Sequence, residues 1–293
     1  MQHKAGFVNI VGNPNVGKST LMNALVGERL SIIASKAQTT RHRIMGIVNG
    51  DDFQIVYSDT PGIVNPHYKL HESMMAFVGA ALQDADLFLL VTEVGETLKN
   101  QETLQKIIKS DIPIILVINK IDTSDQETIL NKIAYWQNQI PRAVIIPASA
   151  TEKFNISTIF DKILELLPEN PPYFPKDELT DRSMRFFVSE IIRGKIILYY
   201  QKEIPYSVEV EVESYKEEEG IDKISVVIYT ERESQKAILI GHQGKSLKKI
   251  GIESRKDIEE FTGKKCFLQL HVKVLKDWRN SESALRRFGY ENN

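Results

Sequence analysis

The stretch GNPNVGKST, residues 12–20, has the residue types and the spacing of a phosphate-binding loop. Four residues separate Gly12 from Gly17-Lys18-Ser19, which is the P-loop pattern. In such a loop, backbone N–H groups surround the phosphates, the lysine reaches the β- and γ-phosphate oxygens, and the hydroxyl ligates Mg²⁺. We therefore predict that a nucleotide is bound by these residues: Gly12, Asn13, Asn15, Val16, Gly17, Lys18, Ser19 and Thr20.

A second Gly-Lys-Ser, in GHQGKSLKK at residues 241–249, fails the same spacing test. Leu239 stands where the first P-loop glycine is needed, and its side chain would obstruct a sharp turn with inward N–H groups. The loop is instead a GxxG sequence between an apolar run and a helical pattern, as in KH domains, which clamp about four single-stranded nucleotides. We predict RNA contacts at Gly241, His242, Gln243, Gly244, Lys245, Lys248 and Lys249.

The region around this second loop is basic, although the chain as a whole is weakly acidic. Ten basic and four acidic side chains between Lys236 and Lys276 give a local balance of +6, against a net charge of −2 for the chain. Such a region is typical of phosphate binding, although a solvated helix face would explain a lysine run alone. The KH-like order of elements favours RNA. For His242, an RNA contact and a plain loop position both stay open.

Two further motifs follow apolar runs and point to guanine. NKID, residues 119–122, and SAT, residues 149–151, each stand at the carboxyl end of a predicted strand. Open α/β sheets bind their ligands at this edge. The Asp122 carboxylate can accept hydrogen bonds from guanine N1–H and the 2-amino group, a pair that adenine lacks, and the Ala150 N–H can reach guanine O6. A helix N-cap is the alternative role for Asp122. The predicted base-side residues are Asn119, Lys120, Asp122, Ser149 and Ala150.

The motif DTPG, residues 59–62, predicts the metal and γ-phosphate side of the site. Asp59 is expected to hold the Mg²⁺ shell, and the Gly62 N–H is expected to touch the γ-phosphate. One threonine of SIIASKAQTTRHR, residues 31–43, should close on both groups. We expect a nucleoside triphosphate to order these segments and hydrolysis to release them.

Ile63 follows DTPG at the place where Ras-like switches carry a glutamine that orients the attacking water. Isoleucine cannot hydrogen-bond to water, so intrinsic hydrolysis should be slow or should use another device. Asn15 is a candidate, because in related GTPases this asparagine helps to hold a K⁺ ion that acts where an arginine finger otherwise would. A turn-supporting role for Asn15 stays open.

Short apolar runs alternate with helical patterns from residue 7 to about residue 167. Bare apolar runs are typical of strands buried on both faces, so the alternation predicts an α/β fold with a doubly wound, mostly parallel sheet. The predicted strands are 7–12, 43–49, 53–59, 86–93, 113–120 and 143–149, and the predicted helices are 18–27, 97–110, 125–139 and 155–167.

Four prolines between positions 168 and 175 indicate a domain boundary. Beyond it the order becomes helix, strand, strand, helix, GxxG loop, helix, strand, with a helical pattern at 185–200 and alternating segments at 206–220, 222–231 and 264–275. We predict a P-loop domain over 1–170, a linker over 171–184, and a smaller α+β KH domain of type II over 185–293.

Composition limits the class of protein. The chain is 42% hydrophobic and 26% charged, as expected for a soluble globular protein. Its single cysteine, Cys266, cannot form an internal disulfide, so we expect a core residue and a reducing cytoplasm. No apolar run approaches the ~20 residues of a membrane helix, and the N-terminus has no signal-peptide pattern. We expect a cytoplasmic monomer.

Taken together, the sequence resembles the bacterial Era GTPase family over essentially its whole length. The resemblance rests on GNPNVGKST, KAQTTRHRI, DTPG, NKID, SAT, IGHQGKSLKKIGIESRKDIE and ALRRFGY, and TTRHRI together with a C-terminal KH domain is the most specific part. It implies GTP or GDP with Mg²⁺, and it favours Thr40 over Thr39 as the switch threonine. The predicted metal ligands are then Ser19, Thr40 and Asp59, and the predicted catalytic residues are Asn15, Lys18, Thr40 and Gly62.

The resemblance also implies a function. A protein of this family would be a GTP-hydrolysing switch that binds near the 3′ end of small-subunit (16S) ribosomal RNA and assists or checks assembly of the 30S subunit. It would also associate peripherally with the cytoplasmic membrane. The short proline-rich linker suggests that nucleotide state and RNA affinity are coupled. The alternatives are a GTPase with an RNA-modification role and a GTPase whose basic face meets anionic lipid.

Overall fold

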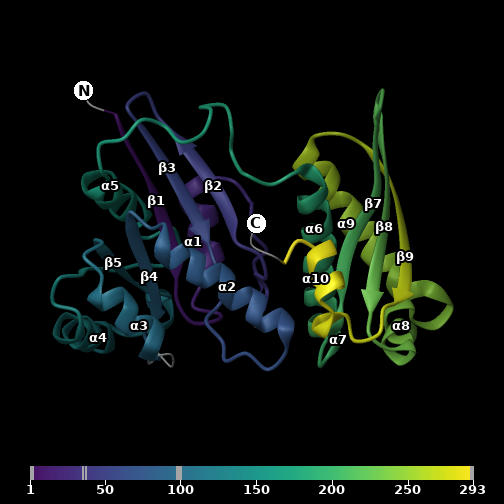
Figure 1. Ribbon diagram of the computed structural model, residues 1–293, viewed down its shortest axis with the longest axis horizontal. Coiled ribbons are helices and arrows are strands. Elements are labelled where there is room, and N and C mark those ends of the chain that lie inside the picture. The colour runs from purple at the N-terminus through teal and green to yellow at the C-terminus, as the bar shows by residue number, and fades with distance from the viewer. Residues whose placement is uncertain (1–2, 35, 37, 97–100, 291–293) are drawn as a thin grey trace. The chain divides into compact units, whose positions relative to one another are not determined.

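The computed structural model describes residues 3–34, 36, 38–96 and 101–290, and these form two compact units (Figure 1). The first unit comprises Met1–Pro66 and His71–Asp181, and the second comprises His67–Leu70 and Arg182–Asn293. Each unit has its own sheet, with six strands in the first and three in the second. Both the α/β class and the smaller second unit were predicted.

The six-stranded sheet of the first unit has the strand order β2-β3-β1-β4-β5-β6. Of these strands, β2 alone is antiparallel to its neighbour, β3, and the remaining pairs are parallel. This confirms the predicted mostly parallel sheet. The strands are β1 (Lys4–Val11), β2 (Ile44–Asn49), β3 (Phe53–Asp59), β4 (Leu87–Glu93), β5 (Ile114–Asn119) and β6 (Val144–Pro147).

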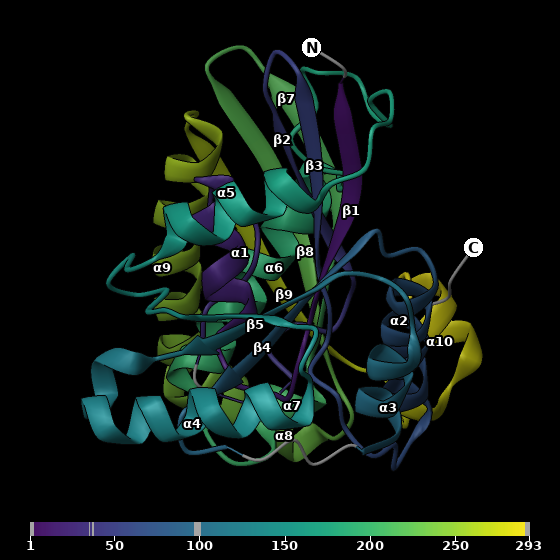
Figure 2. The same cartoon turned by 90° about the vertical axis from the view of Figure 1, so that its left-hand side faces the viewer.

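Helices cover both faces of this sheet, with α1 and α5 on one side and α2 and α3 on the other (Figure 2). The prediction omitted α2, although Leu70, Met74, Phe77 and Ala81 are buried at helical spacing, because Gly79 inside the run weakens the helical pattern. Residues 97–100 of the helix predicted over 97–110 lie outside the described residues. The helices are α1 (Lys18–Val26), α2 (Lys69–Gln83), α3 (Gln101–Lys109), α4 (Gln126–Gln139) and α5 (Ile156–Leu166).

The second unit has the predicted order of a long helix, two strands, a helix, the GxxG loop, a helix and a strand. Strands β7 and β8 are antiparallel, and β8 pairs in parallel with β9. A parallel pair needs a crossover, and α8 with α9 supplies it. The elements are α6 (Met184–Tyr199), α7 (Ile204–Ser207), β7 (Glu209–Glu218), β8 (Ile221–Thr230), α8 (Glu233–Ile240), α9 (Lys245–Thr262), β9 (Cys266–Val274) and α10 (Glu282–Arg287).

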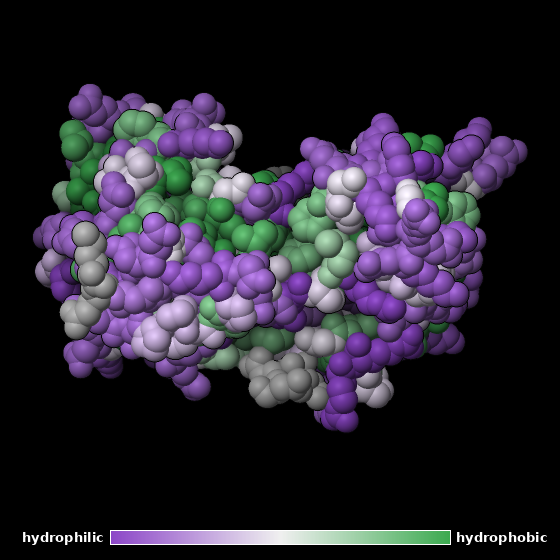
Figure 3. Space-filling model, turned by 90° about the horizontal axis from the view of Figure 1, so that it is seen from above, coloured by the Kyte–Doolittle hydropathy of each residue, from purple (hydrophilic) through white to green (hydrophobic). Residues whose placement is uncertain are grey.

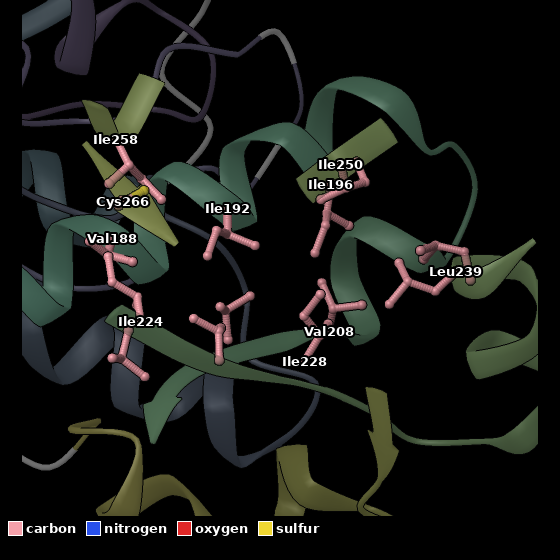
Figure 4. Close-up of a cluster of buried hydrophobic side chains, with 14 residues drawn as sticks. Val188, Ile192, Ile196, Val208, Ile224, Ile228, Leu239, Ile250, Ile258 and Cys266 are labelled. Carbon is pink, nitrogen blue, oxygen red and sulfur yellow. The ribbon is translucent and has the colours of Figure 1, made fainter. Parts of the chain in front are cut away.

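One buried cluster forms the core of the second unit between α6, α9 and the sheet (Figure 4). It contains Val188 and Ile192 from α6, Ile228 from β8 and Ile258 from α9, all fully buried. Cys266 lies in this cluster, which confirms it as a core residue, and burial raises the pKa of its thiol. The core therefore holds α9, and with it the GxxG loop, against the sheet.

Much of the predicted linker 171–184 is hydrogen-bonded to the first unit. The Tyr173 N–H donates to Gln54 Oε1 at 2.7 Å, the Ile47 N–H to Leu179 O at 2.8 Å, and the Thr180 hydroxyl to Met45 O at 2.7 Å. The last two bonds follow the free edge of β2. The division between the compact units falls after Asp181, so most of the segment predicted as a linker belongs to the first unit.

The face shown in Figure 3 is mainly hydrophilic, with hydrophobic side chains gathered in several patches. No helix in the described part of the chain has the length and apolar character needed to cross a membrane.

Candidate nucleotide site and nucleic-acid interface

The P-loop follows β1 and leads into α1, the context that the motif requires. Gly17 has φ +93°, and a Cβ there would lie 2.2 Å from Asn119 Nδ2, so another side chain would be strained and would displace Asn119. The same Asn119 Nδ2 donates to Val16 O at 2.9 Å. The loop is thus held directly against the NKID motif.

Lys18 is buried at the centre of the loop. Its ammonium donates to Asn13 O at 2.8 Å and to Gly12 O at 3.2 Å. Burial lowers the pKa of Lys18 to about 8, although the carboxylates of Asp59 and Glu96 act in the opposite direction. A cation held by backbone carbonyls inside the loop is placed to meet phosphate oxygens.

The three predicted metal ligands come together from three segments. Ser19 Oγ lies 2.6 Å from Asp59 Oδ2 and 2.9 Å from Thr40 Oγ1, and Thr40 Oγ1 lies 3.3 Å from the same carboxylate oxygen. Burial raises the pKa of Asp59 even though Ser19 donates to it. Its other oxygen, Oδ1, is buried and lacks a hydrogen-bond partner among the described residues. Two hydroxyls and a carboxylate with a spare oxygen fit Mg²⁺, which prefers oxygen ligands.

A pocket of about 250 Å³ opens on this cluster. The P-loop, Thr40, Gly62 and Lys120 line it, as does much of the segment 31–43, from which the prediction selected only one threonine. The additional lining residues from that segment are Ile32, Ile33, Ala34, Lys36, Gln38 and Thr39.

The base-side residues lie at the ends of β5 and β6. The Ala150 N–H donates to Asn119 Oδ1 at 3.0 Å, and Lys120 Nζ donates to Asn15 O at 2.6 Å. Asp122 is exposed, and Asp125, not Asp122, caps α4 by accepting from the Thr128 N–H at 2.9 Å. The helix N-cap interpretation of Asp122 is therefore wrong, and its carboxylate is available to a ligand. Asp122, Ser149 and Ala150 lie outside the lining of the 250 Å³ pocket.

Two acidic residues at the carboxyl end of β4 contact the site and were not predicted. Glu93 Oε2 pairs with Lys120 Nζ at 2.5 Å, and Glu96 Oε1 accepts from Asn13 Nδ2 at 2.6 Å. Glu93 ends a buried strand and Glu96 follows it, so both lie at the carboxyl edge of the sheet. The rule that ligands bind at the carboxyl ends of the strands, which located NKID and SAT, therefore applied to Glu93 and Glu96 as well.

The GxxG loop has the backbone that its glycines permit. Gly241 has φ +72°, and a Cβ there would lie 2.2 Å from Ser246 Oγ, so the position requires glycine. His242 and Gln243 are exposed at the tip. Lys245, Lys248 and Lys249 are exposed at the start of α9, and no ion pair joins them to an acidic side chain of the described residues.

Ion pairs reduce the basic region to four unpaired side chains among the described residues, three of them lysines next to the loop and the fourth Lys276. Six of the ten basic side chains between Lys236 and Lys276 pair with carboxylates, so they contribute less to the local field. These six are Lys236, Arg255, Lys256, Lys264, Lys265 and Lys273.

A groove of about 430 Å³ lies between α9 and β9, beside the GxxG loop. Ile252 and Phe267 stand open in it, 48% and 51% exposed, and Lys248 and Arg255 lie along it. An apolar floor with cations at its edge suits bases and a phosphate backbone. The other lining residues are Gly244, Leu247, Gly251, Leu268 and Leu270.

Comparison with known proteins identifies both units. Residues 7–120 match the family model described as 50S ribosome-binding GTPase, and residues 203–279 match that of the KH domain. A GTPase Era from Staphylococcus epidermidis is 42% identical over 292 residues, covering 99% of this chain and 98% of its own. The chain belongs to the Era GTPase family. A GTPase Era from Geotalea daltonii is 43% identical over 293 residues, covering 99% of each chain.

Two solved Era structures resemble the whole chain, each at 38% identity and covering 99% of this chain and 100% of the other. A single-residue variant of Era from Aquifex aeolicus, bound to GDP and AlF4⁻, matches with a TM-score of 0.94. An Era complex with MgGDPNP and nucleotides 1506–1542 of 16S ribosomal RNA matches with a TM-score of 0.95. The first unit is thus an Era-type GTPase domain, and the second contains a KH domain.

The lowered pKa of Lys18 predicts that nucleotide affinity depends on pH. With a pKa of about 8 in the nucleotide-free protein, its ammonium loses its proton as the pH rises through that value. Because phosphate binding favours the charged form, we expect MgGDP affinity to be nearly constant below about pH 7.5 and to fall by up to about tenfold per pH unit above about pH 8. Titration of a fluorescent GDP analogue measures this profile. Lys18→Arg, charged throughout, is the control, and a native profile as flat as that of the control would contradict the prediction.

Proposed function

We propose that this protein is a GTP-hydrolysing switch that binds the 3′ region of 16S ribosomal RNA and assists or checks assembly of the 30S subunit. The observation that carries this proposal is the pairing, in one chain, of a P-loop with convergent Mg²⁺ ligands and a GxxG loop beside an apolar groove. The solved Era complex with nucleotides of 16S ribosomal RNA supports the choice of RNA.

On the GTPase side, each residue has a chemical task. Lys18 stabilises negative charge on the β- and γ-phosphates, and the N–H groups at the start of α1 bind the phosphate oxygens. Ser19, Thr40 and Asp59 hold Mg²⁺, which neutralises phosphate charge when bound. Because Thr40 belongs to the segment 31–43, binding of the γ-phosphate is expected to fix this segment, and hydrolysis is expected to release it.

Ile63 supports an unusual hydrolytic device. Its side chain is apolar and buried, and its N–H donates to Gly12 O at 3.3 Å, so neither group can orient the attacking water as a glutamine side chain does. Asn15 is exposed, has φ +67° and lines the pocket. A K⁺ ion held by Asn15 would supply the positive charge that an arginine finger supplies elsewhere.

This role predicts a dependence on the monovalent cation. Hydrolysis by the native protein should slow by about tenfold or more when KCl is replaced by NaCl, since the arginine-finger charge is worth at least that much in related enzymes. The Asn15→Ala variant should be slow in both salts. Single-turnover GTP hydrolysis gives the rates. Equal native rates in both salts would leave Asn15 with the turn-supporting role.

Coupling between nucleotide and RNA has a structural basis in β2. This strand begins four residues after Thr40, and its free edge bonds to Leu179 and Thr180, shortly before the chain enters the second unit. A change in the segment 31–43 would therefore reach the chain that leads to the KH domain. We propose that GTP and GDP set different RNA affinities by this route.

The direct test is binding of a single-stranded oligonucleotide, matched to the 3′ end of 16S ribosomal RNA, to protein loaded with a GTP analogue or with GDP. Tight binding in the GTP form alone supports both the RNA site and the coupling. Equal binding in both forms would contradict the coupling. Absence of binding in both would contradict the RNA site, and binding to anionic vesicles instead would favour the peripheral membrane role.

Gly244→Asp should remove RNA binding without unfolding the domain. Gly244 has φ +73° and open space around its Cβ position, and aspartate tolerates this backbone region better than most residues. The new carboxylate would repel the RNA backbone, so we expect a loss of about tenfold or more in oligonucleotide affinity. GTP affinity should not change, and fluorescence anisotropy measures both.

Gly263→Asp is the matched control. Gly263 has φ +67° and open space around it, but it lies at the opposite end of α9. The Gly263→Asp variant should bind RNA like the native protein, and equal losses of RNA affinity in both variants would contradict a specific role for the GxxG loop.

We further propose that the protein acts as a cytoplasmic monomer with at most peripheral membrane contact. Light scattering tests the oligomeric state, and cell fractionation tests the location.

A further inference from the structure

Tyr199, the last residue of α6, lies beside the start of α9 and carries a cation on its ring. The side chain is 38% exposed, and Lys249 Nζ lies 4.2 Å from the ring centroid. The preceding Leu198 is 63% exposed. An exposed aromatic ring with an adjacent lysine and an adjacent apolar side chain is the composition of a base-stacking surface.

The position of Tyr199 is fixed relative to the GxxG loop. The hydroxyl of the next residue, Tyr200, donates to Leu239 O at 2.7 Å, two residues before the loop. Tyr200 also hydrogen-bonds with Ser246, which follows the loop and fills the space behind Gly241. The end of α6 is therefore tied to the chain on both sides of the RNA clamp.

Tyr199 and the groove are on different sides of α9. The groove lies toward β9, whereas α6 packs elsewhere on α9 and is joined to it by the ion pair of Lys195 with Asp257 at 2.7 Å. Lys245 and Lys249 are four residues apart, so they stand one above the other on one exposed face of the helix. Helical spacing places that face between the groove and Tyr199.

The charge on this face is not neutralised by a carboxylate of the described residues. Lys245 and Lys249 have no carboxylate partner in the described part of the chain, unlike Arg255 and Lys256 further along the helix, which pair with Glu259 and Glu253. Unneutralised cations next to an aromatic ring distinguish a nucleic-acid surface from an ordinary solvated helix.

We propose that Tyr199 stacks with a base of the bound RNA outside the groove, and that the strand reaches it over Lys245 and Lys249. This inference rests on the proposed RNA-binding function and extends it. A KH groove holds about four nucleotides, so the Tyr199 site can be reached only by a longer strand. Its ligand is a single-stranded nucleotide of any base, because every base has a face that can stack.

The test compares two oligonucleotides of one sequence series, about four and about eight nucleotides long, so that only the longer extends beyond the groove. Tyr199→Ala should bind the longer one about tenfold more weakly than the native protein and the shorter one equally well. Tyr199→Phe should behave like the native protein. Tyr135→Ala is the matched control, because Tyr135 is also exposed (43%) with Lys132 at 5.3 Å from its ring, but lies in the GTPase unit.

A tryptophan at the same position gives a second readout. The two native tryptophans, Trp136 and Trp278, are buried, so Tyr199→Trp introduces an exposed one. Its fluorescence should be quenched by the longer oligonucleotide and not by the shorter. If the native protein binds both oligonucleotides and Tyr199→Ala binds each of them as tightly as the native protein does, this inference is wrong and the proposed function stands. If neither binds the native protein, the proposed function fails and the inference fails with it.

Discussion

Replacing Lys18 by alanine is expected to reduce GTP hydrolysis by about a hundredfold to a thousandfold, the usual effect of removing one preorganised donor to transition-state charge. Lys18 is the buried cation of the P-loop, and its hydrogen bonds to Gly12 O and Asn13 O hold it in place. The lost charge-assisted contacts should also weaken GDP binding by about tenfold to a hundredfold. Single-turnover hydrolysis at saturating GTP and titration with labelled GDP measure the two effects.

Lys18→Met separates this functional effect from a loss of folding. Burial lowers the pKa of Lys18 to about 8, so the ammonium still predominates at neutral pH, but carrying the charge costs the folded, nucleotide-free protein free energy. An apolar chain of similar length removes that penalty, so the melting temperature without nucleotide should not fall. Hydrolysis within tenfold of the native rate in either variant would contradict the assigned role.

Asp122→Asn is expected to change the base preference from guanine to xanthine. The Asp122 carboxylate presents two acceptors, which match guanine N1–H and the 2-amino group. An asparagine amide presents one acceptor and one donor, which match the N1–H and the 2-carbonyl of xanthine. Because a hydrogen-bonded site rejects an analogue that leaves a polar group unpaired, GDP affinity should fall by about a thousandfold or more.

Competition between GDP and xanthosine diphosphate against a labelled nucleotide measures this exchange. Asp125→Asn is the matched control, since Asp125 caps α4 and asparagine caps a helix equally well. The control should retain the preference for guanine. Weak binding of both bases by Asp122→Asn would indicate damage to the site, and an unchanged preference for GDP would contradict the role of Asp122.

Local patterns in the sequence were sufficient to predict the framework of both units. The burial of β4 and β5 on both faces follows from their bare apolar runs. The P-loop spacing placed Lys18 at the start of α1, and the failure of that spacing at Leu239 separated the second loop from the first. Such features depend on residues close together in the chain, so the sequence alone carries them.

The sequence did not determine which distant residues meet. Asn119 joins Val16 to Ala150, and the carboxylate of Glu96 accepts from Asn13 just beyond the end of β4, because the strand order brings these loops to one edge of the sheet. The extension of the first unit along β2 likewise depends on an edge that exists only after the sheet has formed.

Tertiary structure also decided which charges remain available. Lys264 pairs with Asp222 and Lys273 with Glu213, both partners lying on the preceding strands, whereas Lys245 and Lys249 stay unpaired among the described residues. A count of charges along the chain cannot show this, because neutralisation depends on distances of a few ångströms between segments far apart in sequence. The sequence alone thus determined the two loops and the kind of ligand each can bind. The tertiary structure decided which side chains are positioned to contact those ligands.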